Sequence, residues 1–152
     1  VRIPWNISYS SSKCKLCYYI IPIIFILFIL TFFFFSCMKI YSESRPWGKF
    51  EKFHENKSCT VKLIYVNANS RLSLQYHNLK DETIFLWSGR MLFEIKEGEE
   101  LVKREMKPGE AVHITPGTVH RMTAIEDCDI FEVSTPELHD VVRLEDRYGR
   151  TT

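Results

Sequence analysis

Short stretches of alternating apolar and polar residues fill the chain after Met38, with a period of two that is typical of strands. In one such stretch Val61, Leu63 and Tyr65 fall on one face, while Lys62 falls on the other. Nine segments follow this pattern and are predicted to be strands: 49–54, 60–66, 72–77, 83–87, 91–96, 100–106, 111–114, 119–124 and 129–133.

Turn-forming residues separate these segments, because a glycine follows each of Ser88, Glu97, Pro108 and Pro116. A helical periodicity appears only near residues 136–146. Many short, evenly spaced strands without a strand–helix–strand rhythm predict an all-β sandwich or barrel, such as a jelly roll with two sheets. Its core is expected to contain the large aromatic residues Trp47, Phe85, Trp87, Phe93 and Phe131.

The N-terminal part of the chain differs in kind. Residues 18–35 form an apolar run of eighteen positions without a charge, which suits a membrane-spanning helix or an uncleaved signal anchor. The printed chain opens with Val1, however, and its first methionine is Met38, so the run could equally be translated upstream DNA. Both interpretations stay open, and we divide the chain into a hydrophobic segment, 1–37, and a β domain, 38–152.

Charge and cysteine content narrow the classes of partner. The chain has 20 lysines and arginines against 19 aspartates and glutamates, a net charge of +1. This balance excludes a nucleic-acid footprint based on excess positive charge and leaves a small phosphorylated ligand, which two or three placed cations could bind. Five irregularly spaced cysteines predict no disulfide framework. We expect a cytoplasmic protein, membrane-anchored through residues 18–35 only if these are made.

Two segments carry the candidate chemistry. Gln75 and His77 are two residues apart on a predicted strand and therefore share a face. Glu82 begins the next strand, and His120 can approach the same place from a facing strand. A glutamine oxygen, two imidazoles and a carboxylate form a mixed oxygen and nitrogen donor set. The sequence therefore predicts one divalent metal ion, with zinc, manganese, cobalt and iron all compatible.

The spacing of these residues resembles the two motifs of the cupin family, with a glutamine in place of the first histidine. The matching residues are Gln75, His77, Glu82 and Gly89 for the first motif, and Gly109, Gly117 and His120 for the second. The glutamine, together with segments 45–48 and 140–150, resembles the isomerase domain of type II mannose-6-phosphate isomerases. In that family the domain usually follows a mannose-1-phosphate guanylyltransferase domain. The resemblance implies a cupin double-stranded β-helix, a jelly-roll barrel.

The same resemblance implies a function, a metal-dependent isomerase that interconverts mannose 6-phosphate and fructose 6-phosphate. Lys80 and Arg121 each neighbour a predicted ligand and are the candidates for gripping the phosphate. The general base stays unidentified, with His113 as a weak candidate, and His139 is given no role because it lies outside both motifs. The alternative is a non-catalytic cupin that binds a sugar or nucleotide-sugar as an accessory module. A homodimer is left open.

One residue departs from the isomerase pattern. Leu79 stands where the QxHxHRxE motif of the family has its second histidine, and Lys80 replaces the arginine. If the strand continues, residue 79 shares the face of Gln75 and His77 and points toward the substrate. Because leucine can neither donate nor accept a proton, we expect it to weaken isomerisation while leaving the metal bound.

Overall fold

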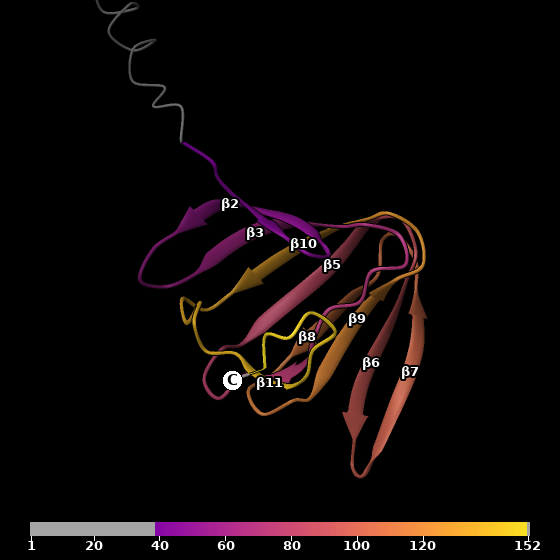
Figure 1. Ribbon diagram of the computed structural model, residues 1–152. Coiled ribbons are helices and arrows are strands. Elements are labelled where there is room, and N and C mark those ends of the chain that lie inside the picture. Colours follow the sequence, from indigo (N-terminus) through magenta and orange to yellow (C-terminus); the bar gives the residue numbers. More distant parts are fainter. Residues whose placement is uncertain (1–38, 152) are drawn as a thin grey trace, which may run out of the picture. The chain divides into compact units, whose positions relative to one another are not determined.

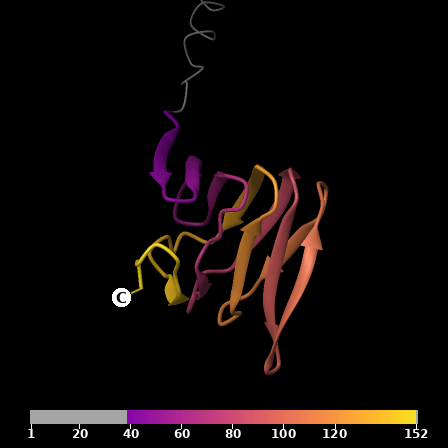
Figure 2. The same cartoon turned by 45° about the vertical axis from the view of Figure 1, so that its right-hand side comes forward.

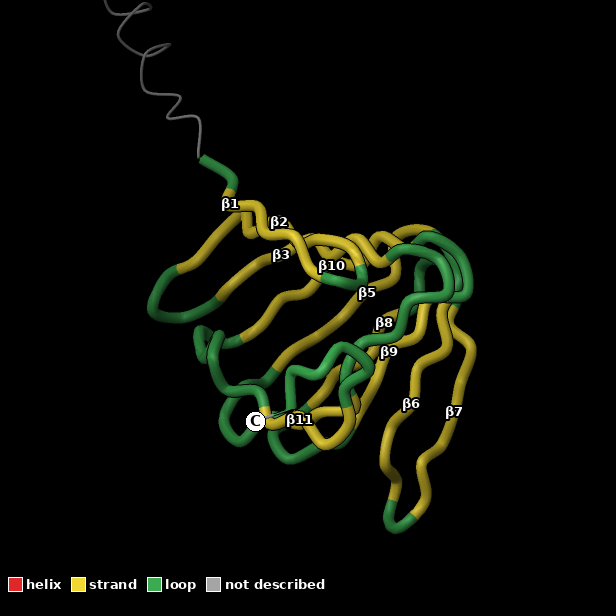
Figure 3. Tube along the Cα trace, in the orientation of Figure 1, coloured by secondary structure: helices red, strands yellow, loops and turns green. Residues whose placement is uncertain are grey.

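The computed structural model describes residues 39–151, which form two antiparallel β-sheets (Figures 1 and 3). The six-stranded sheet has the order β1-β2-β3-β10-β5-β8, and the five-stranded sheet has the order β11-β4-β9-β6-β7. The strands are β1 Tyr41–Arg45, β2 Gly48–Glu55, β3 Thr60–Val66, β4 Leu74–Tyr76, β5 Glu82–Ser88, β6 Met91–Glu97, β7 Glu100–Met106, β8 Ala111–Ile114, β9 His120–Ala124, β10 Cys128–Ser134 and β11 Val142–Glu145.

Alternation along β5 shows how the sequence selects the inner face of a sheet. Ile84 and Leu86 are fully buried, whereas Trp87 is 63% exposed. Glu82 is in phase with Ile84 and Leu86, so its carboxylate also points inward, at the end of the strand. The strand therefore supplies both core packing and one residue of the candidate site.

The hydrophobic core draws on both sheets, with Ile84 and Ile130 from the six-stranded sheet and Phe93 from the five-stranded one. The prediction of core aromatics is confirmed for Trp47 and Phe93, which are buried. It is wrong for Trp87, because this residue lies on the outward face of β5. The hairpin of β6 and β7 forms one edge of the five-stranded sheet (Figures 1 and 2).

Two parts of the predicted strand pattern need correction. The helical periodicity near residues 136–146 is not realised, and the chain instead forms turns followed by β11. Pairing with β4, which places Arg143 opposite Gln75, outweighs the weak local preference for helix. Strand β1 was not predicted, because its residues are mostly exposed and pair only with β2.

The hydrophobic segment 1–37 lies outside the described residues, and so does the membrane helix predicted within it. Among residues 39–151, no helix has the length and apolar character needed to cross a membrane. Every residue of the core cluster falls between Trp47 and Ile130.

Gly89 tests how tightly the end of β5 packs against the loop before β10. Its φ is +86°, and a Cβ atom there would lie 2.1 Å from the carbonyl oxygen of Asp127. We expect Gly89→Ala to lower the free energy of unfolding by about 2 kcal/mol more than Gly109→Ala, measured by urea denaturation. Gly109 is the matched control, since its φ of +93° is similar but a Cβ there meets nothing within 4 Å. Equal losses in the two variants would contradict this account.

Candidate metal centre

Three buried side chains converge at one end of the barrel. His77 lies just beyond β4, Glu82 begins β5 and His120 begins β9. The Nε2 atoms of His77 and His120 lie 3.1 Å and 3.3 Å from Oε1 of Glu82. One ligand atom from each residue falls within 4.8 Å of the others, so the three could hold a metal ion. The structure thus brings together three of the four residues predicted from the sequence, and their role as metal ligands stays a prediction.

The hydrogen bonds behind the two imidazoles determine which nitrogen faces the centre. Nδ1 of His77 donates to the carbonyl oxygen of Asp140, and Nδ1 of His120 donates to that of Thr118 at 3.0 Å. Because a carbonyl oxygen can only accept, each neutral ring carries its proton on Nδ1 and presents a lone pair at Nε2. Two nitrogen lone pairs and a carboxylate oxygen then face one another. Nε2 of His120 is buried without a hydrogen-bond partner, as a metal ligand would be.

The second oxygen of Glu82 belongs to a buried ionic network. Lys80 Nζ bonds Oε2 of Glu82 and lies 2.9 Å from Oε1 of Glu132, which also pairs with Lys62 at 2.8 Å. Burial alone would raise the pKa of Glu82, but the charge of Lys80 and its hydrogen bond to Oε2 lower the pKa of that carboxyl. Glu82 is therefore an anion that faces the histidines on one side and Lys80 on the other.

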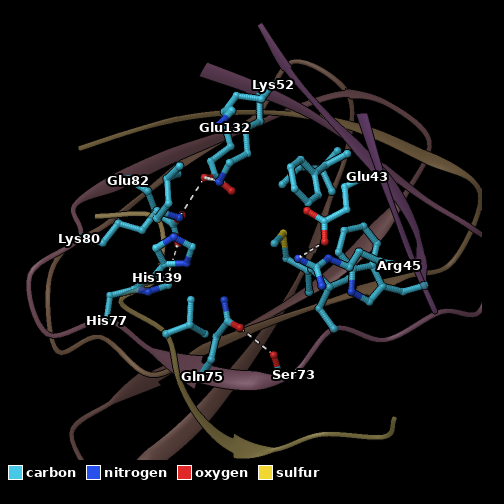
Figure 4. Close-up of a pocket in the computed structure, with 18 of the residues that line it drawn as sticks. Glu43, Arg45, Lys52, Ser73, Gln75, His77, Lys80, Glu82, Glu132 and His139 are labelled. Atoms are coloured by element: carbon cyan, nitrogen blue, oxygen red, sulfur yellow. Dashed lines mark hydrogen bonds and ion pairs between the residues drawn. The ribbon is translucent and has the colours of Figure 1, made fainter. Parts of the chain in front are cut away.

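Gln75, the fourth predicted ligand, lies close to the same centre. Its backbone is paired with that of His120 across β4 and β9, and its side chain lines the same cavity as His77. The side-chain oxygen of Gln75 accepts a hydrogen bond from Ser73 Oγ at 2.7 Å (Figure 4). Its role as a metal ligand stays a prediction.

Gln75, His77 and Glu82 line a cavity of about 330 Å³, a size that suits a small ligand. In Figure 4, His77, Lys80 and Glu82 lie on one side of the cavity, and Glu43 and Arg45 lie on the other. Six lysine and arginine side chains and four glutamates line it, so the walls carry a surplus of positive charge.

Sequence reasoning missed His139, which lines the cavity and projects toward it beside His77 in Figure 4. The residue belongs to neither cupin motif, and only the return of the chain after β10 brings it to the site. Its neighbour Asp140, whose backbone carbonyl supports His77, could have pointed to this position only once the fold was known.

Lys80, one of the two predicted phosphate-binding cations, is only 5% exposed and is held by the carboxylates of Glu82 and Glu132. These carboxylates raise the pKa of Lys80 although burial opposes them. The other, Arg121, contacts Glu94 through two nitrogens at 2.5 Å and 3.0 Å and does not line the cavity. Their roles toward phosphate stay predictions, but both already have anionic partners.

Two other sequence expectations concern the surroundings of the site. His113 is exposed on β8, with Nε2 2.8 Å from Oδ1 of Asp81, and it does not line the cavity. The expectation that Leu79 points toward the substrate is wrong, because β4 ends at Tyr76 and the side chain of Leu79 is 68% exposed in the loop that follows. Strand alternation no longer applies at that position.

Asp140 fixes this loop. Its carboxylate accepts hydrogen bonds from the backbone N–H groups of Asn78, Leu79 and Lys80 at 3.1, 2.5 and 2.9 Å. These hydrogen bonds hold the pKa of the Asp140 carboxyl well below its usual range. The same residue accepts the Nδ1 proton of His77 through its backbone carbonyl. Asp140 therefore positions both a candidate ligand and the chain that connects it to Glu82.

Comparison with known proteins matches residues 37–146 to the family described as "Mannose-6-phosphate isomerase C-terminal". The xanthan biosynthesis protein XanB of Xanthomonas campestris pv. campestris is 31% identical over 112 residues, which cover 70% of this chain and 23% of that protein. The mannose-1-phosphate guanylyltransferase ManC of Salmonella typhimurium is 32% identical over 114 residues, 70% of this chain and 22% of that protein. The chain thus spans less than a quarter of the length of these relatives.

Solved structures with a similar fold include the capsular polysaccharide assembling protein CapF from Staphylococcus aureus, with a TM-score of 0.62 and 16% identity over 74% of this chain and 33% of that one. Another is KdgF from Halomonas sp., with a TM-score of 0.57 and 18% identity over 68% of this chain and 92% of that one. At such identities the likeness shows the fold alone. The predicted all-β cupin fold is confirmed.

Metal binding can be measured directly. We expect the purified chain to bind about one equivalent of zinc, manganese, cobalt or iron, and His77→Ala and His120→Ala to lose it, because each removes one of three converging ligands. Metal content after dialysis, measured by mass spectrometry, checks this. His113→Ala is the matched control, since its imidazole pairs with Asp81 away from the cavity. Equal metal content in all four proteins would rule out the centre.

Because Asp140 holds His77 and the 78–80 loop, a change at Asp140 should affect metal binding although Asp140 is not itself a candidate ligand. Asp140→Asn weakens the bonds to the 78–80 loop, and we expect metal affinity to fall about 10- to 100-fold, as is typical of residues that orient metal ligands. Competition with a chelator gives the affinity. Asp127→Asn is the control, because Asp127 Oδ1 also accepts a backbone N–H, that of Ala68 at 2.7 Å, but Asp127 is not one of the cavity-lining residues. A similar drop in both variants would show a general loss of stability instead.

Proposed function

The chain belongs to the family of mannose-6-phosphate isomerase C-terminal domains, and from this premise we propose that it is a metal-dependent isomerase acting on mannose 6-phosphate and fructose 6-phosphate. The observation that carries the proposal is the convergence of His77, Glu82 and His120 beside a cavity of about 330 Å³ with a positive surplus. The relatives named for xanthan synthesis and mannose-1-phosphate guanylyl transfer support a place in polysaccharide precursor metabolism.

A divalent ion held by His77, Glu82 and His120, with Gln75 as a fourth ligand, would supply Lewis acidity at the sugar's carbonyl and adjacent hydroxyl oxygens. The protein's own contribution is to orient these ligands. Asp140 and Thr118 fix the tautomer of each imidazole, and the buried network around Lys80 keeps Glu82 ionised.

Aldose–ketose isomerisation also needs a group that moves a proton between two neighbouring carbons. Glu82 is a poor candidate, because one of its oxygens faces His77 as a candidate metal ligand and the other is bound by Lys80. His139 lines the cavity and has no other assigned partner among the described residues, whereas His113 faces Asp81 outside it. We therefore assign the base to the imidazole of His139 rather than to His113.

The proposal is tested by the conversion of mannose 6-phosphate to fructose 6-phosphate by the full chain loaded with each candidate metal. Activity should disappear with a chelator. His139→Gln should lower kcat by about 10²- to 10⁴-fold with little change in metal content, because a positioned proton carrier is lost. His113→Gln should leave kcat unchanged, because His113 faces Asp81 outside the cavity. Comparison of the two variants therefore distinguishes the two candidate bases.

Leu79→His is a further control, and we expect it to leave the rate unchanged because the side chain projects into solvent. Binding of the sugar phosphate without any turnover, at full metal content, would refute the isomerase and replace it by a non-catalytic sugar-binding module. A large loss in His113→Gln and none in His139→Gln would overturn the assignment of the base.

A further inference from the structure

One cation in the cavity differs from all the others. Five of the six lysine and arginine side chains that line it form ion pairs with described carboxylates: Arg45 with Glu43, Lys52 with Glu55, Lys62 and Lys80 with Glu132, and Arg150 with Asp146. Arg143 forms none within residues 39–151, and its Nε is buried without a hydrogen-bond partner. An arginine without a partner is unusual, because its donors need acceptors when they leave water.

The charges around Arg143 also favour an anion beside it. Burial lowers the pKa of its guanidinium, and the positive charge of Arg150 lowers it further, as does that of Arg45. The one carboxylate that opposes this effect, Asp146, is already bound by Arg150 through two nitrogens. Arg45, Arg143 and Arg150 thus lie near one another at the cavity. Only two of the three, Arg45 and Arg150, are paired with a carboxylate. An anion placed there would meet donors that are already assembled.

The sheet fixes where this cluster lies relative to the metal centre. Arg143 on β11 is the direct partner of Gln75 on β4, and Gln75 is the direct partner of His120 on β9. Partners in adjacent strands share a face, so the three side chains form one row across the sheet. Two strand spacings separate the ends of the row by roughly 10 Å. That separation suits an extended six-carbon sugar with its reactive carbons at one end and a phosphate at the other.

We propose that Arg143, flanked by Arg45 and Arg150, binds the phosphate monoester of the substrate at the side of the cavity away from His77 and Glu82. This inference rests on the proposed function for the identity of the sugar, but not for the anion site itself. In this proposal the phosphate is bound by the guanidinium of Arg143, which has no ion-pair partner among residues 39–151, and not by Lys80 or Arg121, which already have carboxylate partners.

Calorimetric titration of the full chain with mannose 6-phosphate, mannose and inorganic phosphate tests the site without any need for turnover. We expect the phosphorylated sugar to bind at least about tenfold more tightly than mannose, and Arg143→Gln to abolish this advantage while leaving mannose binding unchanged. Arg147→Gln is the matched control, because it removes the same charge from the same segment but does not line the cavity. It should keep the advantage.

A second readout separates a binding arginine from a structural one. Without ligand, Arg143→Gln should melt no lower than the unchanged chain, since the guanidinium has no partner to lose and two like charges nearby. If this variant does not fold, Arg143→Lys serves instead, because lysine keeps the charge but cannot offer the forked donors, and the advantage should shrink.

The inference would be overturned if Arg143→Gln, or Arg143→Lys in its place, kept the full phosphate advantage. It would also be overturned if the unchanged chain bound mannose 6-phosphate no more tightly than mannose. A loss of the phosphate advantage in Lys80→Gln or Arg121→Gln alone would overturn it as well. Failure of the proposed function looks different. A chain that prefers the phosphorylated sugar through Arg143 but never converts it would retain the phosphate site and lose the isomerase.

Discussion

The buried carboxylate of Glu82 is the interaction on which the candidate site depends. A buried anion is costly unless it is paired, and Glu82 is paired with the buried ammonium of Lys80. One oxygen faces the Nε2 atoms of His77 and His120, and the other is bound by Lys80. Together with Lys62 and Glu132, this gives two cations and two anions, so the buried network is electrically neutral. The oxygen that faces the two histidines is therefore held ionised without depending on solvent.

This balance also limits what Lys80 can do. Breaking a buried ion pair by removing one partner costs about 3–5 kcal/mol, whereas a hydrogen bond to a charged group contributes about 1.5–3 kcal/mol. A lysine that turned away from Glu82 and Glu132 to reach a phosphate would therefore lose more than it gained. Its position in sequence, beside the ligands, suggests contact with substrate, but its burial assigns it to holding Glu82.

The spacing of residues along the chain correctly predicted the positions that depend on strand geometry alone. His77, Glu82 and His120 lie at strand ends whose registers follow from alternation, so they could be placed together from the sequence. Leu79 could not, because its orientation depends on where β4 stops and on the capping of the loop by Asp140. The prediction that Trp87 lies in the core was wrong for a related reason. Its strand was predicted correctly, but the face that Trp87 occupies follows from the inward orientation of Glu82 on the same strand.

The part of the site that the sequence did not predict comes from the segment after β10. His139, Asp140 and Arg143 fall within residues that looked weakly helical, and they acquire meaning only when β11 pairs with β4. That pairing completes the sheet beside the candidate metal ligands. The same segment places the Asp140 carboxylate against the 78–80 loop and the Arg143 guanidinium at the cavity. A segment whose local preferences are weak is thus fixed by its neighbours, and because its side chains line the cavity it contributes to which ligand fits there.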